Sequence, residues 1–223
     1  MTKKIIIPYV IATLAMVACI SVAADDGAVV ARSYAGYNNQ KPSVASENVY
    51  RPVNLSWNNT FKKVTAEEAL EVKDGVLVFA FPQCPFCRNL IPELAEVAKE
   101  ENETIYYCQV DEYRDKYEFD ALTGKPVKTQ EAGEGYYELL DWLSDYLNDY
   151  AVADNNKNKI KVGEKRISAP TVIRIESGQP VSTWLLEDVE DAGYPANAFD
   201  TWNDDTQAKV TKSLHNYFEE KER

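Results

Sequence analysis

The chain has 223 residues, of which 45% are hydrophobic and 27% are charged, a composition typical of one folded domain with additional segments. Lys and Arg number 24 against 36 Asp and Glu, which gives a formal net charge of −12. Because this excess of negative charge repels a phosphate backbone, the composition argues against nucleic-acid binding.

Residues 1–24 have the pattern of a targeting segment. Lys3 and Lys4 precede twenty uncharged residues that end in small side chains before Asp25, as in a Sec-type signal peptide. The same run of about 20 residues is long enough to span a bilayer as a retained anchor. The stretch ending at Cys19, Met-Val-Ala-Cys, also resembles a bacterial lipobox. Each alternative predicts that the rest of the chain is exported, either secreted or membrane-anchored at the cell surface.

Residues 25–56 show little periodic pattern and are rich in Asn, Ser, Ala and Tyr. This composition predicts an extracytoplasmic spacer between the export site and a folded domain. An ordered strand near Tyr50–Leu55 is the alternative. The domain itself is expected to cover residues 57–223.

The first half of this domain alternates strands and helices. Residues 61–64 are expected to form a short edge strand, and Thr65 with Glu68 has the form of a capping box that starts a short helix. The apolar run 76–81 is typical of a central strand buried on both faces. A helix over 88–101, kinked at Pro92, and a strand over 104–111 then imply a right-handed parallel crossover.

The second half is expected to contain an insertion and a closing unit. Apolar side chains recur at helical spacing between Tyr136 and Tyr150, so a helical insertion is predicted over about residues 112–165. Two strands flank the Ser177-Gly178 turn as a β-hairpin, and residues 206–223 form the last helix. The predicted fold class is therefore α/β, with a mixed central sheet between layers of helices.

Two cysteines, Cys84 and Cys87, follow the buried strand at the expected start of a helix. Unpaired N–H groups and the positive end of the helix dipole favour a thiolate there, which predicts Cys84 as a nucleophile. Cys87, one turn further on, can attack a mixed disulfide and release the substrate. Pro85 suits the first helical turn, and Phe86 adds an apolar surface beside the sulfurs.

Two other uses of the pair remain open from the residues alone. A structural zinc site needs four ligands, whereas the exported part offers only Cys108 and His215 in addition, so no metal is predicted. A purely structural disulfide would close so short a loop that its stabilisation is small. For Cys108, a buried structural cysteine and a resolving thiol are the two alternatives.

The motif "CPFCRNLIP" resembles the thioredoxin superfamily, in which a proline lies five residues after the second cysteine, here Pro92. "APT" resembles the family loop with a cis-proline facing the disulfide, here Pro170, and Ala169 would then present its backbone to substrate. The resemblance covers about residues 60–111 and 165–223 and implies a three-layer thioredoxin-like sandwich. With the export signal, the chain looks like exported or anchored thioredoxin-like proteins of Gram-positive bacteria, including bacteriocin transport accessory proteins.

The chain departs from thioredoxins at two positions. Gln83 replaces the tryptophan before the first cysteine, and Val78 replaces the buried aspartate six residues before it. That carboxylate would accept the proton of the second thiol, so the resemblance leaves the deprotonation of Cys87 unexplained.

The expected function is an extracytoplasmic thiol–disulfide oxidoreductase that exchanges disulfides with protein or peptide substrates and a redox partner. No cofactor is expected, and contact with a membrane would run through the N-terminal segment if it is not cleaved. The alternative is a thioredoxin-fold binding module that assists peptide export, such as bacteriocin export, without redox turnover.

Overall fold

The computed structural model describes residues 25–220, so the predictions for residues 1–24 lie outside the described part. Its helices are α1 (Asp26–Ala35), α2 (Ala66–Leu70), α3 (Pro85–Glu100), α4 (Tyr136–Trp142) and α5 (Asp204–Glu219). Its strands are β1 (Phe61–Val64), β2 (Gly75–Ala80), β3 (Ile105–Gln109), β4 (Lys116–Asp120), β5 (Lys125–Gln130), β6 (Asn148–Ala153), β7 (Lys159–Arg166), β8 (Thr171–Glu176) and β9 (Gln179–Trp184). Short 3-10 helices occupy Val110–Glu112, Ser144–Tyr146 and Leu186–Asp188.

A mixed five-stranded sheet forms the centre of the molecule, in the order β1-β3-β2-β8-β9. β1, β3 and β2 are parallel, and β8 and β9 join as an antiparallel pair. The predicted edge strand, buried central strand, parallel crossover and hairpin are therefore confirmed. The α/β class with a mixed sheet is also confirmed, and its arrangement is compatible with a thioredoxin-like fold.

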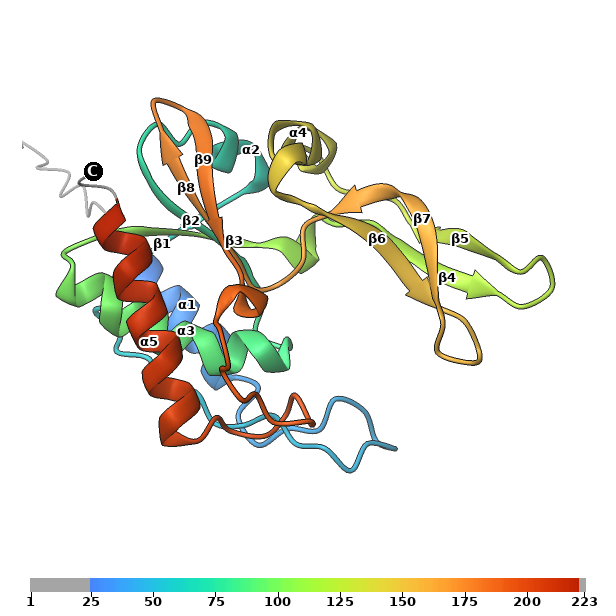
Figure 1. The fold of residues 1–223 in the computed structure, drawn as a ribbon, viewed down its shortest axis with the longest axis horizontal. Helices are drawn as coiled ribbons and strands as arrows, with labels where there is room; N and C mark the ends of the chain where they lie inside the picture. The colour runs from blue at the N-terminus through green and yellow to red at the C-terminus, as the bar shows by residue number, and fades with distance from the viewer. Residues whose placement is uncertain (1–24, 221–223) are drawn as a thin grey trace, which may run out of the picture.

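Helices cover both faces of the sheet, which gives three layers (Figure 1). Because side chains alternate along a strand, Val76 and Val78 of β2 lie in the core with α1, α3 and α5. Leu77 and Phe79 lie in the second core, with α2 and α4. The continuous apolar run of β2 is thus explained by burial on both faces.

The prediction of a spacer over residues 25–56 is wrong. Residues 26–35 form α1, capped by the Asp25 carboxylate, and its Val30 and Tyr34 are in the main core. Tyr50 and Val53 are buried as well, although the segment around them is not a strand. These apolar side chains have no strong period in sequence, and only the docked position of α1 beside β1 gives them a partner.

The predicted helical insertion over about 112–165 is also wrong in most of its length. Two antiparallel hairpins, β4–β5 and β6–β7, occupy it, and α4 is a helix of only seven residues. The hairpins extend together from the body as an arm (Figure 1). Tyr117 and Tyr150 join them through an edge-to-face ring contact at 5.6 Å. Part of the apolar stripe at helical spacing belongs to α4, whereas Leu147 and Tyr150 lie beyond it.

No helix within residues 25–220 has both the length and the apolar character needed to cross a membrane.

Candidate functional site

Cys84 and Cys87 lie at the N-terminus of α3, where the chain leaves β2. Cys84 is the N-cap residue, and its sulfur accepts the backbone N–H of Cys87 at 3.2 Å. Pro85 occupies the first helical position, where its missing N–H costs no hydrogen bond. Cys84 is 4% exposed and Cys87 is fully buried, whereas Phe86 is 43% exposed. The first sulfur is therefore at the surface edge of the site and the second is behind it.

The loop before β8 brings Ala169 and Pro170 to the cysteines. The Ala169–Pro170 peptide bond is cis, as the resemblance implied. The thiol of Cys84 donates to the carbonyl oxygen of Ala169 at 3.3 Å, although 85 residues separate the two in sequence. Pro92 is half-buried in the interior of α3, about 7.5 Å along the helix axis from Cys87, so it lies away from the sulfurs.

The two thiols have opposite acidities. Burial alone would raise the pKa of Cys84, but hydrogen bonds from Cys87 and from the Phe86 backbone, with the charge of Arg114, lower this pKa below its ordinary value. Burial raises the pKa of Cys87 well above the ordinary value, and its hydrogen bond to Cys84 raises it further. Cys84 is therefore the more acidic thiol of the pair, and Cys87 is the less acidic one.

Arg114 is a site residue that the sequence analysis missed. Its guanidinium lies over the ring of Phe81, with its carbon 4.6 Å from the ring centroid. Phe81 accepts the backbone N–H of Cys84 at 3.1 Å, so the cation lies against the segment that presents the sulfur. Within residues 25–220 no carboxylate is within ion-pair distance of Arg114. Its charge favours the thiolate form of both cysteines, although burial still keeps the pKa of Cys87 raised.

Two tyrosines lie near Val78, the position at which the resemblance to thioredoxins predicted a buried carboxylate. Val78 is fully buried and pairs in register with Tyr107 of β3. The Tyr107 hydroxyl lies 3.4 Å from that of Tyr34, on α1. Burial raises the pKa of Tyr34 well above its usual value, and the charges of Tyr107 and Cys87 raise it further, so this hydroxyl stays protonated at neutral pH. The N-terminal segment therefore supplies one neutral hydroxyl group, that of Tyr34, on the Cys87 side of the sheet.

Cys108 lies on the opposite face of the sheet. It packs in the core with α2 and α4, whereas Cys84 and Cys87 belong to the core with α1, α3 and α5. Burial raises the pKa of Cys108 to about 12. A role as a resolving thiol for this pair is therefore excluded by the sheet between them, and Cys108 is a buried core residue.

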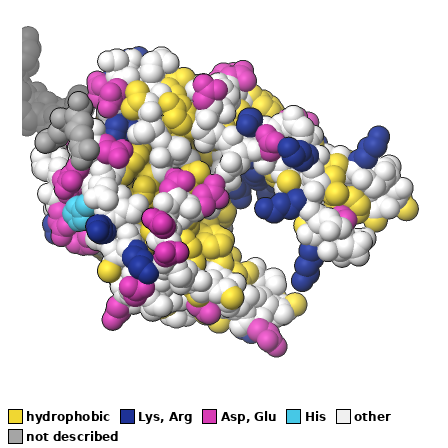
Figure 2. Space-filling view, viewed as in Figure 1, with side chains coloured by type: hydrophobic (Ala, Val, Ile, Leu, Met, Phe, Trp, Pro, Cys, Tyr) yellow, Lys and Arg dark blue, Asp and Glu magenta, His cyan; other side chains and the backbone are white. Residues whose placement is uncertain are grey.

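An apolar groove begins at the cysteines. A cavity of about 310 Å³ is lined by Phe86, Ala169 and Pro170 on the side of the cysteines and by Leu185, Leu186 and Tyr194 opposite. Hydrophobic side chains are exposed on the body beside the hollow that separates it from the arm (Figure 2). An extended chain lying in this groove would pass next to the sulfur of Cys84.

Within residues 25–220, no group of three or more His, Cys, Asp or Glu side chains is arranged to hold a metal ion.

Comparison with protein-family models, with curated proteins and with solved structures finds no match to this chain.

Proposed function

We propose that this protein is a thiol–disulfide oxidoreductase of the thioredoxin superfamily that acts on protein or peptide substrates outside the cytoplasm. The observation that carries the proposal is the division of roles between two thiols one helical turn apart. Cys84 has a lowered pKa at the site edge, and Cys87 is fully buried with a raised pKa. Cis-Pro170 and the Ala169 carbonyl group beside Cys84 support the same function.

The proposed reaction has two exchange steps. The Cys84 thiolate attacks one sulfur of a substrate disulfide, forming a mixed disulfide and releasing the other substrate sulfur as a thiolate, which takes a proton. Cys87 then loses its proton and attacks the Cys84 sulfur, which forms the Cys84–Cys87 disulfide and frees the second substrate thiol. The substrate gains two electrons and two protons, and the dithiol of the protein loses them.

The same steps run backwards when the protein is the oxidant, so its direction depends on the potential of the couple and on the partner that recycles it. Export would place the protein where disulfides persist. Arg114 supports an oxidising tendency, because a cation that stabilises the Cys84 thiolate stabilises the reduced form. A redox titration of the Cys84–Cys87 couple against glutathione would measure this potential directly.

An insulin-reduction assay on the purified protein with dithiothreitol tests the proposal. Turnover is expected for the wild type and for Cys108→Ser, and its loss is expected for Cys84→Ser. Cys87→Ser should accumulate a mixed disulfide with the substrate, which non-reducing electrophoresis detects. Equal rates in the wild type and Cys84→Ser, or no turnover in either, would support the alternative of a binding module without redox activity.

A further inference from the structure

The apolar groove at the cysteines continues onto the arm. A second cavity, of about 930 Å³, is lined by residues 147–153 around β6, together with residues of β7. It shares Asn148, Ser168 and Glu187 with the groove at Phe86 and Pro170, so the two cavities are adjacent. One extended chain can therefore contact the redox site and the β6–β7 hairpin at the same time.

The hairpins are basic on an otherwise acidic protein. Residues 116–130 and 148–166 contain eight Lys or Arg against five Asp or Glu, whereas the whole chain has a net charge of −12. Lys and Arg side chains of the arm border the hollow between arm and body (Figure 2). A partner that enters this hollow thus meets an arm with a net positive charge.

Three lysines form a row on β7. Exposed and half-buried residues alternate along this strand, which places Lys159, Lys161 and Lys165 on its exposed face. Lys159 and Lys165 line the second cavity. Asp149 is bound by Lys161 at 2.8 Å and by Lys165 at 3.3 Å. The ammonium group of Lys159 has no ion-pair partner within residues 25–220, and is therefore available for a carboxylate from outside.

Two acidic side chains also line the second cavity, and one of them is paired with lysines. Asp149 is held by the two lysines, and Glu187 accepts a hydrogen bond from the Asn148 side chain at 3.3 Å. Arg166, a further lining residue, is paired with Asp115. Among the charged lining residues, the cation of Lys159 and the carboxylate of Glu187 therefore have no ion-pair partner within residues 25–220, whereas Asp149, Lys165 and Arg166 are paired.

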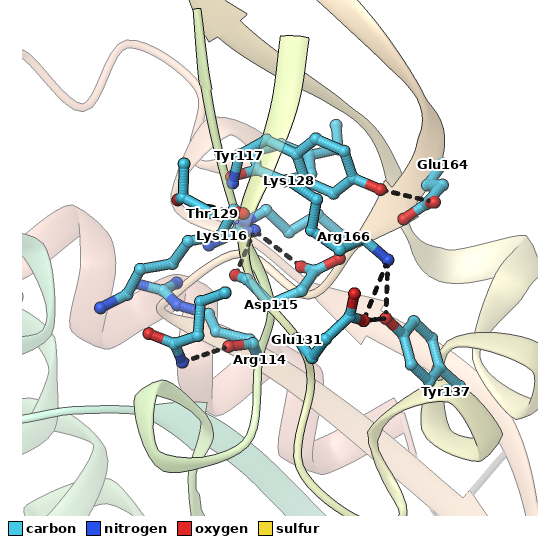
Figure 3. A network of polar contacts seen from close by, with 12 residues as sticks. Arg114, Asp115, Lys116, Tyr117, Lys128, Thr129, Glu131, Tyr137, Glu164 and Arg166 are labelled. Carbon is cyan, nitrogen blue, oxygen red and sulfur yellow. Dashed lines mark hydrogen bonds and ion pairs between the residues drawn. The ribbon is translucent and has the colours of Figure 1, made fainter.

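A polar network holds the base of the arm (Figure 3). Arg166 contacts Asp115 at 3.2 Å and lies 3.9 Å from the centroid of the Tyr150 ring. Tyr117 donates its hydroxyl to Glu164 at 2.8 Å, across from β4 to β7. The Asp115 side chain is 3% exposed, so this pair is shielded from water. The lysine row is thus presented toward the groove by a fixed support.

We infer that the arm is a substrate-binding element. It selects polypeptide substrates that carry acidic residues several positions away from the substrate cysteine that reacts with Cys84. At about 3.3 Å per extended residue, the five residues from Lys165 to Pro170 span roughly 16 Å, and the eleven from Lys159 span at most roughly 36 Å. Acidic side chains about five to ten positions from the substrate cysteine reach the row. The inference rests on the proposed function and adds its substrate class.

Three synthetic peptides test this inference, each with one intramolecular disulfide loop and four Glu, four Gln or four Lys at positions five to ten on both sides. The kcat/KM for their reduction is measured with dithiothreitol as the recycling reductant. We expect the Glu peptide to exceed the Lys peptide by about tenfold at low ionic strength, because each exposed charge pair contributes modestly. The difference should shrink in about 0.5 M salt, where the screening length is a few ångströms.

Two triple variants with the same change in net charge identify the surface. Lys159→Gln/Lys161→Gln/Lys165→Gln should remove the preference for the Glu peptide over the Gln and Lys peptides. The matched control, substitution of the exposed Lys62, Lys99 and Lys212 by Gln, should retain the preference.

The outcomes separate the inference from the proposed function. Equal kcat/KM for the three peptides, with turnover that depends on Cys84, overturns the role of the arm and leaves the oxidoreductase intact. A preference that survives loss of the lysine row, or that disappears equally in the control variant, also overturns it. Absence of Cys84-dependent turnover with every peptide and with insulin overturns the proposed function itself.

Discussion

Replacement of Arg88 by methionine is expected to destabilise the protein strongly and to detach the N-terminal segment from the redox loop. Arg88 follows Cys87 directly and is fully buried. Its guanidinium donates to the carbonyl oxygens of Arg51, Tyr34 and Pro82. Arg88→Met keeps an unbranched apolar stem and removes all of these donors.

The magnitude follows from the number of acceptors left behind. The guanidinium donates twice to Arg51, at 2.8 and 2.6 Å, and once each to Tyr34 at 3.2 Å, Pro82 at 2.9 Å and the Asn38 side chain at 2.5 Å. Each buried acceptor left without a partner costs about 1–3 kcal/mol, and relief of the buried charge offsets part of the total. We expect a loss of about 3–5 kcal/mol, a large part of the 5–15 kcal/mol typical of a domain.

Urea unfolding monitored by tryptophan fluorescence measures this loss in the purified protein. Limited proteolysis should show new cleavage between residues 36 and 51, because Arg88 no longer binds that segment. Arg88→Lys is the matched control, which keeps the charge but not the planar fork of donors, and should lose roughly half as much stability. A loss below about 1 kcal/mol for Arg88→Met, with unchanged proteolysis, would show that the acceptors find other partners and refute the reasoning.

Four further predictions concern the thiols and the core around them. In the reduced protein, the rate at which iodoacetamide alkylates Cys84 should reach half its maximum at a pH below 9.0, the ordinary pKa of a thiol. Arg114→Met should raise this midpoint pH, whereas Arg114→Lys should leave it unchanged. Because the pKa of Cys84 is lowered in the folded protein, its contribution to stability is present above the pKa of the unfolded chain and is lost as the pH falls through the pKa of the folded protein. Urea unfolding at a series of pH values should show this change in the free energy of unfolding, and Cys84→Ser should abolish it. Cys108 should be alkylated only after unfolding, as peptide mapping will show. Because its pKa in the folded protein is raised to about 12, the stability that it contributes is complete below about pH 9 and is lost as the pH rises toward 12. If Cys108→Ala leaves the pH dependence of the unfolding free energy above pH 9 unchanged, the raised pKa of Cys108 is contradicted. Val78→Asp should cost roughly 3 kcal/mol in urea unfolding because it buries a carboxyl group beside Tyr107, and a neutral effect would mean that this region already admits water.

The two wrong predictions have different physical origins. In the insertion, residues 116–120 do alternate between exposed and half-buried side chains, and Gly124 adopts the positive φ of a tight turn. This alternation and turn indicate a hairpin, but the apolar side chains after Tyr136 recur at helical spacing and favour the prediction of a helical insertion. In the N-terminal segment no comparable signal existed, because the burial of Val30 and Tyr34 depends on a sheet and a helix that lie far along the chain.

The sequence by itself determined the elements whose causes are local. The capping box at Thr65, the doubly buried strand before Cys84, and the hairpin around Ser177-Gly178 all follow from patterns within a few residues. So does the placement of the two cysteines at a helix start, because a strand, a proline and an apolar helix face adjoin them in the chain.

Only the tertiary structure decided how the pair is set for chemistry. The Ala169 carbonyl group and the Arg114 cation come from separate segments, and each acts on a sulfur through space. Local patterns record the periods of helices and strands, but the pKa of a thiol depends on every charge and dipole around it, whatever its position in the chain. The tertiary structure also decided that Cys108 cannot reach Cys84 or Cys87, because the sheet lies between them.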